Sequence, residues 1–241
     1  MKRLMEDEIK NSILHNKNLF DRYGPVGDSL IIYEKTINWK TIADCLLFSS
    51  NKGIIGIEIK TEYDTLKRLP HQLEDYIRVC KYTYVYCHDS HVKKVKELIK
   101  DNPELDCVGI ISYEQFEDQA ITGMIRRANP SSKVTLRGTT SILWSSELNA
   151  ILNAKTHTKE KRRRVDAENL FGEMFSKDSQ QKVIAGLYIK GLLDSKKPLQ
   201  RYHFGNIYTH DTTTGGDFHS KAEKRKWHQR SIINRRRVSK Q

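Results

Sequence analysis

The sequence predicts an α/β fold, a sandwich in which helices flank a central mixed sheet, followed by a helical and basic C-terminal region. Three observations support this prediction. Short apolar or alternating stretches are typical of strands, and stretches with helical spacing of apolar residues recur between them. After about residue 130 the strand patterns stop. We therefore expect a first domain over 1–130, a helical domain over 131–210 and a basic, flexible tail over 211–241.

The N-terminal part predicts a helix followed by a β-hairpin. Residues 24–28 are rich in glycine and proline and break the chain, and residues 29–33 fit a short strand or a helical turn. Two strands over 44–48 and 54–60 are joined by a turn at 51–53. The preceding helix is predicted within residues 3–20, where four apolar residues share one face: Met5, Ile9, Ile13 and Phe20.

The strand over 54–60 places a charged pair on one side of the sheet. Strand side chains alternate between the two faces, so Glu58 and Lys60 point to the same side. That side also carries Ile54 and Gly56, and the opposite side carries only isoleucines. We therefore expect a polar site where this apolar strand ends.

The remaining elements alternate and then become entirely helical. Residues 69–81 and 91–101 predict helices, and residues 83–87 and 108–111 predict strands. Three further helices are predicted in the C-terminal region, over residues 141–154, 166–175 and 179–193. We expect Trp144 to pack within this helical region rather than to stack on a base.

The charge balance favours a polyanionic partner. The 241 residues include 42 Lys and Arg against 30 Asp and Glu, which gives a net charge of +12. Cations that meet phosphates release counterions, so such a protein is suited to nucleic acid; a basic ribosome-associated protein is the alternative. No apolar run reaches the length of a membrane span and the N-terminus is acidic, so we expect a cytoplasmic protein whose four cysteines are free thiols.

The residues that best suggest chemistry lie around the predicted hairpin. Asp44 begins one strand and Glu58 ends the next, so their carboxylates can approach each other. Two carboxylates form an oxygen-rich site suited to Mg²⁺ or Mn²⁺, and Lys60 beside them could hold a water molecule. Amphipathic strands also produce Glu-x-Lys by chance, but an unpaired charge against a core strand is costly, and a metal would relieve that cost.

This arrangement resembles the PD-(D/E)XK nuclease superfamily, in its RecB-type and lambda-exonuclease-type branches. Asp44 matches the acidic position, residues 58–60 match the E-x-K, and Gln72 and Tyr76 match the Q-x-x-x-Y of the following helix. The region is also similar to small uncharacterised bacterial and phage proteins of that superfamily. No proline precedes Asp44, which is a departure from the pattern.

The resemblance implies a restriction-endonuclease-like fold and a metal-dependent deoxyribonuclease, an enzyme that hydrolyses phosphodiester bonds. The implied catalytic residues are Asp44, Glu58, Lys60, Gln72 and Tyr76. The implied ligands of Mg²⁺ or Mn²⁺ are Asp44, Glu58, Ile59 through its carbonyl, and Glu8 from the first helix. Exonucleases and endonucleases share these motifs, so the mode of cleavage stays open, as does a homo-oligomeric state.

Basic residues outside this cluster are candidates for phosphate contact. They fall before the predicted helix at 69–81, in the run at 159–164 and in the tail, and comprise Lys67, Arg68, Arg162, Arg163, Arg164, Lys224, Arg225, Lys226, Arg235, Arg236 and Arg237. The alternative function is a non-catalytic nucleic-acid-binding protein that uses the helical module and the basic tail. A nuclease fold that has lost activity is a third possibility.

Overall fold

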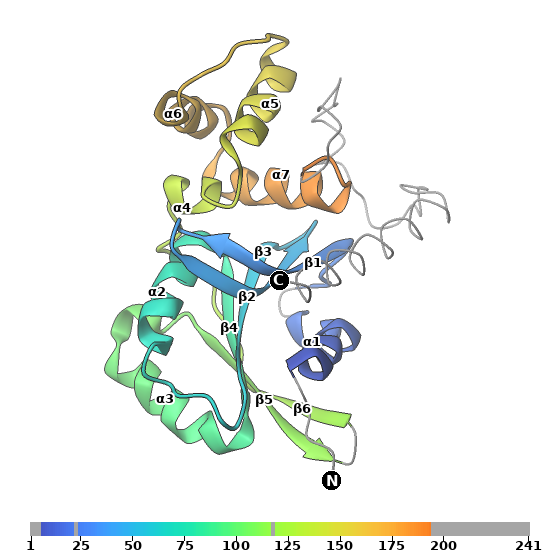
Figure 1. Cartoon of the computed structure of the whole chain (residues 1–241), viewed down its shortest axis with the longest axis vertical. Coiled ribbons are helices and arrows are strands. Elements are labelled where there is room, and N and C mark those ends of the chain that lie inside the picture. The colour runs from blue at the N-terminus through green and yellow to red at the C-terminus, as the bar shows by residue number, and fades with distance from the viewer. Residues whose placement is uncertain (1–5, 22–23, 117–118, 194–241) are drawn as a thin grey trace, which may run out of the picture.

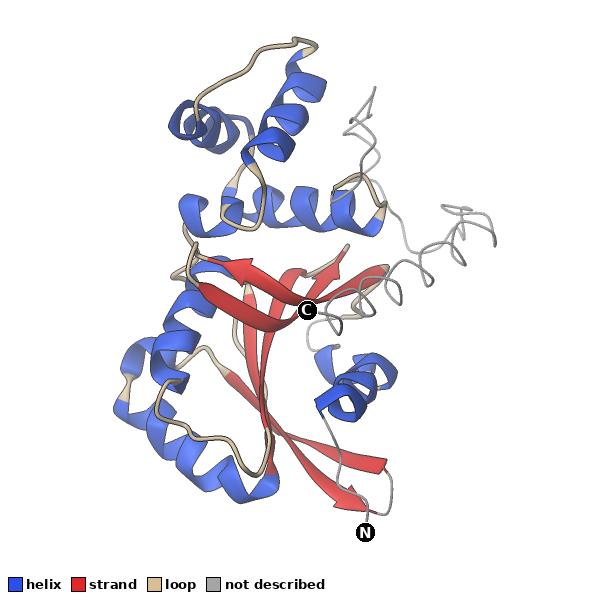
Figure 2. Ribbon diagram, in the orientation of Figure 1, coloured by secondary structure: helices blue, strands red, loops and turns tan. Residues whose placement is uncertain are grey.

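The computed structural model describes residues 6–21, 24–116 and 119–193. Its centre is one six-stranded mixed sheet with the strand order β1-β2-β3-β4-β5-β6 (Figures 1 and 2). The first three strands are antiparallel, β4 runs parallel to β3 and β5 runs parallel to β4, and β6 returns antiparallel to β5. The strands are β1 Ser29–Ile37, β2 Thr41–Ser49, β3 Gly53–Lys60, β4 Tyr82–His88, β5 Gly109–Phe116 and β6 Gln119–Arg126.

Helices cover both faces of this sheet. The α-helices are α1 Glu6–His15, α2 Leu69–Val79, α3 Val92–Asp101, α4 Leu136–Thr140, α5 Ser145–Thr156, α6 Arg164–Met174 and α7 Lys177–Ile189. Short 3₁₀ turns lie at Lys17–Phe20, Asp89–His91 and Pro103–Leu105. The predicted α/β fold with a mixed sheet and flanking helices is therefore confirmed.

Side-chain alternation along β3 explains how the layers form. Ile55 and Ile57 join the core beneath α1, whereas Ile54 on the other face joins the core beneath α7. On that second face, α2 and α3 cover β4 and β5 through a separate apolar cluster that includes Val85. The prediction that Glu58 lies on the face of Ile54 places it beneath helices rather than in solvent.

The helical region packs directly onto the sheet. Helix α7 lies across β1, β2 and β3, and α5 and α6 lie on its far side (Figure 1). Phe48 of β2 stacks on Tyr188 of α7 with ring centroids 4.4 Å apart. The helices and the sheet therefore share one core cluster, and the domain boundary at residue 130 stays a prediction.

Several predicted bounds differ from the structure. Strand β1 continues to Ile37, β5 continues to Phe116, and β6 and the short α4 were not predicted. The sequence of β6 hides its strand character because Gly123 interrupts this edge strand and its two isoleucines are exposed instead of marking a buried face. The predicted strand over 44–48 begins earlier, at Thr41, and the three C-terminal helices are each displaced by a few residues.

Two other expectations can be compared with the described residues. All four cysteines are free thiols, as predicted, and burial raises the pKa of Cys87 to about 12. Trp144 does not pack in the helical core; its side chain is 68% exposed, because α5 begins at Ser145 and leaves Trp144 before the helix. No helix within the described ranges is both long and apolar enough to cross a bilayer.

Candidate functional site

The central sheet opens at Asp44. Glu34 of β1 lies opposite Asp44 of β2 and has a φ of 55°. The strands pair on both sides of these two residues, but Glu34 and Asp44 do not pair with each other. The β2–β3 ladder stops one residue further along, at Cys45 and Ile57. The Asp44 N–H therefore donates instead to the Tyr76 hydroxyl, at 2.9 Å, and its Oδ2 accepts from the Ile59 N–H at 2.8 Å. A carboxylate thus replaces the backbone partner that a regular strand would supply.

Glu58 is the most buried charge of the cluster. Its side chain has no exposed surface, and its Oε1 pairs with the Lys60 ammonium at 2.6 Å. Lys60 itself is only 9% exposed. Glu58 Oε2 is also buried, yet it accepts no hydrogen bond within the described part of the chain. Such an unpartnered oxygen is costly unless another group reaches it.

Helix α2 closes the cluster from above the sheet. Tyr76 packs over Gly56, where any Cβ atom would collide with the Tyr76 ring and with Cys80 Sγ. Burial raises the pKa of Tyr76 well above its ordinary value, and the nearby carboxylates of Glu58 and Asp44 raise it further. The phenol therefore stays protonated and donates toward the Ile57 carbonyl at 3.4 Å. One turn earlier, Gln72 holds a buried Oε1 that accepts no bond from the residues described here.

The first helix approaches from the opposite face. Glu8 is partly buried in α1, two residues before Lys10. The Lys10 ammonium pairs with Glu34 at 3.1 Å, and the Lys10 carbonyl accepts from the Tyr33 hydroxyl at 3.0 Å. Helix α1 is therefore anchored at the place where the β1–β2 ladder opens.

The structure thus brings together most of the predicted cluster. Asp44, Glu58, Lys60 and Tyr76 are joined by hydrogen bonds, ion pairing or charge proximity, and Ile59 joins them through its N–H. The metal-ligand and catalytic roles assigned to them from the sequence stay predictions. The hydrogen bonds and the ion pair among these side chains do not by themselves show that they bind a metal ion or act on a substrate.

A second buried acid was not predicted. Asp75 lies on α2 and accepts hydrogen bonds from Asn38 at 2.6 Å and from the Thr41 hydroxyl, with Lys40 at 3.4 Å. It ties α2 to the turn between β1 and β2. Its position beside Tyr76 offered a signal, because a carboxylate that is buried with the apolar side of a helix is costly unless it has a partner.

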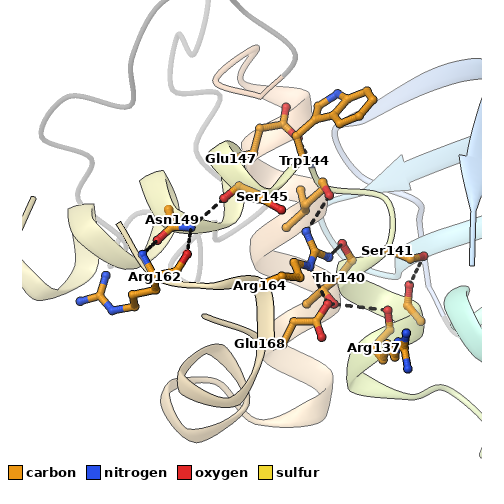
Figure 3. Close-up of polar contacts among 12 residues, drawn as sticks. Arg137, Thr140, Ser141, Trp144, Ser145, Glu147, Asn149, Arg162, Arg164 and Glu168 are labelled. Atoms are coloured by element: carbon orange, nitrogen blue, oxygen red, sulfur yellow. Dashed lines mark hydrogen bonds and ion pairs between the residues drawn. The ribbon is translucent and has the colours of Figure 1, made fainter. Parts of the chain in front are cut away.

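The predicted phosphate-binding residues fall into three groups. Lys67 and Arg68 are exposed just before α2. Arg163 is 88% exposed and pairs with Asp166, whereas Arg162 and Arg164 are largely occupied by contacts within the helical region (Figure 3). The tail group lies outside the described residues: Lys224, Arg225, Lys226, Arg235, Arg236 and Arg237.

Comparison with known protein families gives a match over residues 1–197 to the family described as "Bacteriophage P4 protein cII". The match spans well over half of the chain. The chain belongs to this family. A member of the phage P4 cII family, "Protein cII" of Enterobacteria phage P4, is 24% identical over 151 residues. The alignment covers 62% of this chain and 53% of that protein, so the chain matches about half of its relative's length.

One solved structure also resembles the fold in part. It is a protein of unknown function, SPO1766, from Silicibacter pomeroyi, with a TM-score of 0.40 and 10% identity. The similarity covers 65% of this chain and 94% of the other. A likeness this distant carries no functional conclusion.

Membership of the P4 cII family overturns the nuclease interpretation. The resemblance to the PD-(D/E)XK superfamily was wrong, and with it the deoxyribonuclease activity and the enzyme class that it implied. The restriction-endonuclease-like assignment of the fold rested on the same resemblance, so only the α/β mixed-sheet description stands. The residues of the motif do gather in space, but the motif is short and Glu-x-Lys also arises by chance in amphipathic strands, whereas the family match covers residues 1–197.

Proposed function

We propose that this protein binds nucleic acid through its helical, basic C-terminal region. The observation that carries the proposal is the division of charge along the chain. Residues 1–130 hold 19 Lys and Arg against 20 Asp and Glu, whereas residues 131–241 hold 23 against 10. The net charge of +13 in the second region suits a partner with regularly spaced phosphates, because each neutralised phosphate releases counterions.

Part of this charge lies on an ordered loop between α5 and α6. Three of its cations are exposed, namely Lys159, Lys161 and Arg163, and Lys155 is exposed beside them in the last turn of α5. The loop is at the end of the molecule farthest from the lower sheet, where α5 and α6 are joined (Figure 1). The position leaves these cations accessible to a large polyanion.

Two asparagines explain why this loop keeps its shape. Asn149 on α5 bonds to both the N–H and the carbonyl of Arg162, at 2.8 and 3.1 Å, as a neighbouring strand would (Figure 3). One turn later, Asn153 donates to the Glu160 carbonyl and accepts from the Arg162 guanidinium at 2.7 Å. A loop held in this way presents its cations without a large ordering cost on binding.

A charge-matched comparison tests the proposal. The variant Lys159→Gln/Lys161→Gln/Arg163→Gln removes three exposed cations from the loop. The control Lys93→Gln/Lys94→Gln/Lys96→Gln removes three exposed cations from α3, in the sheet region. Affinity for a labelled duplex is measured by fluorescence anisotropy over a series of salt concentrations.

The loop variant should bind more weakly, and its log–log salt slope should fall by about 0.9 for each lost phosphate contact. The α3 control should keep the wild-type slope. A tail variant, Lys224→Gln/Arg225→Gln/Lys226→Gln, should also reduce the slope if that segment contacts phosphate. Equal losses from the loop and α3 variants, or no binding by the wild-type chain, would remove the proposal.

We also infer that the cluster around Glu58 binds a divalent cation such as Mg²⁺ or Mn²⁺, independently of any catalysis. The supporting observation is that two buried oxygens, Glu58 Oε2 on β3 and Gln72 Oε1 on α2, each accept no hydrogen bond within the described ranges. Oxygen donors of this kind suit Mg²⁺, which commonly binds to one or two carboxylates and retains water molecules. The described residues contain no group of three or more His, Cys, Asp or Glu suited to a metal, so Gln72 and water would complete the shell.

Titration calorimetry with Mg²⁺ and with Mn²⁺ tests this second proposal. The wild-type chain should bind one cation, and Glu58→Gln should abolish that binding. The control Glu62→Gln removes an exposed carboxylate a few residues away and should leave the binding intact. If the wild-type chain binds neither cation, Glu58 and Lys60 form a structural ion pair only.

A further inference from the structure

The turn between β1 and β2 holds a bulky residue in a conformation that disfavours it. Asn38 and Trp39 both have left-handed backbone angles, with φ of 48° and 68°. Asparagine tolerates this region, whereas a large side chain there is strained. The Trp39 ring is nevertheless 49% exposed, so burial of the indole accounts for little of its presence. Strain of this kind is often retained at sites of function.

Arg164 holds one face of this indole. Its guanidinium carbon is 4.7 Å from the centre of the Trp39 ring. Three further contacts fix the guanidinium: Nε bonds to Glu168 at 2.6 Å, and the two terminal nitrogens bond to the carbonyls of Leu143 and Thr140 at 3.0 and 2.7 Å (Figure 3). The cation is therefore rigid, and it fixes the orientation of the Trp39 ring.

A second exposed tryptophan borders the same junction. Trp144 directly follows Leu143, whose carbonyl Arg164 binds, and its indole points away from the polar network (Figure 3). The backbone N–H of Trp144 donates to the Glu147 carboxylate at 2.7 Å, which holds the backbone at the start of α5. The exposed Arg163 and Val165 directly precede and follow Arg164 in the chain. Aromatic, apolar and cationic groups thus meet where the hairpin contacts the helical region.

We propose that Trp39 and Trp144 form a stacking site for the unpaired bases of a single-stranded nucleic acid. The proposal rests on the nucleic-acid binding proposed above and specifies the form of the ligand. Every base offers a flat face to an indole, and the neighbouring cations suit the phosphates. In a duplex those faces are already stacked on one another, so only unpaired bases could use this site.

The surroundings favour this ligand over a protein partner. An apolar protein interface would gain from neutral surroundings, whereas this junction adjoins the basic connection from α5 to α6. Six of the ten residues from 155 to 164 are Lys or Arg, and only Glu160 is acidic. A polyanion that also carries flat apolar surfaces matches both properties.

Variants of the full chain test the site. Trp39→Gly removes the ring and suits the left-handed backbone, and Trp144→Ala removes an exposed side chain before α5. The control Phe116→Ala removes an aromatic at the end of β5 whose exposure lies between those of the two tryptophans. Fluorescence anisotropy compares binding to a single-stranded oligonucleotide and to a duplex of the same sequence, and circular dichroism confirms that each variant is folded.

Each tryptophan variant should weaken single-strand binding by about fivefold to a hundredfold, as the loss of one stacked base does, while duplex binding and the Phe116→Ala control stay unchanged. If the wild-type chain binds nucleic acid but neither tryptophan variant changes single-strand affinity, the stacking site is refuted and the proposed function stands. If both forms of nucleic acid weaken equally, the site does not select unpaired bases. If the wild-type chain binds no nucleic acid, both proposals fall.

Discussion

Charged side chains serve different purposes in the sheet region and in the helical region. Lys60, at the end of β3, is nearly buried and paired with a fully buried Glu58. Arg163, before α6, is almost fully exposed beside Asp166. A buried cation is committed to its internal partner, whereas an exposed cation is available to an external one. Burial therefore decides which role a charge can take: the Lys60–Glu58 pair can stabilise the fold, whereas Arg163 is accessible to the polyanion proposed above.

The largest expected effect comes from breaking the buried pair. Lys60→Ala would leave Glu58 charged in the core without its partner, and removing one member of a buried pair costs about 3–5 kcal/mol. Urea unfolding followed by circular dichroism in the presence of a chelator would measure the loss. We expect the midpoint to fall without a change in the slope of the transition.

A double variant separates the pair from the packing around it. Glu58→Leu/Lys60→Met removes both charges and keeps similar volumes, so it should be much more stable than Lys60→Ala. If the two variants were equally unstable, the stability would come from the shape of these side chains and not from their charges.

Two neighbouring arginines sharpen the comparison within the helical region itself. Arg164→Gln breaks an ion pair with Glu168 and two hydrogen bonds to carbonyls, all in a partly buried place. Bonds of this charged kind each contribute about 1.5–3 kcal/mol, and we expect a loss near 2–3 kcal/mol because they share one side chain. Thermal unfolding should detect this loss, whereas Arg163→Gln should leave the melting temperature unchanged. Similar losses in both variants would contradict the assigned roles.

The fold was more predictable than the function because the two depend on different signals. Alternation along β3 correctly separated Glu58 from Ile55 and Ile57, since a period of two follows from strand geometry alone. The same reasoning failed for β6, whose Gly123 and exposed position leave little pattern. It also failed for Trp144, because a shift of the helix start by a few residues moves a side chain from core to surface.

The cluster around Asp44 illustrates a separate limit. The predicted hairpin brought Asp44 and Glu58 together, whereas Tyr76 was added only through the resemblance to a nuclease motif. All three are joined in the structure. Proximity of such residues does not determine a reaction, because the same carboxylates can replace backbone partners or pair with a lysine. The contact between Arg164 and Trp39 could not have been predicted, since it joins residues 125 positions apart through tertiary packing.

The smallest expected effect concerns an ion pair between the two regions. Asp178, in the first turn of α7, pairs with Lys81 before β4 and with Lys182 at 2.8 Å. Burial alone would raise the pKa of Asp178, but hydrogen bonds to Lys182 and Lys81 outweigh it and lower the pKa. The carboxylate is 51% exposed, so solvent screening limits its contribution to about 0–1 kcal/mol.

The sign of the pH dependence follows from that lowered pKa. The stabilisation is complete above the unfolded value, near 3.9, and is lost as the pH falls through the lower folded value. Melting temperatures of the wild-type chain and Asp178→Asn should therefore differ slightly from pH 5 to 7 and converge once the pH falls below the lowered folded pKa. Repeating the measurement in a Lys81→Gln/Lys182→Gln background should abolish the difference. If it persisted there, the carboxylate would be stabilising the positive N-terminal end of α7, and the contact between sheet and helices would not depend on this pair.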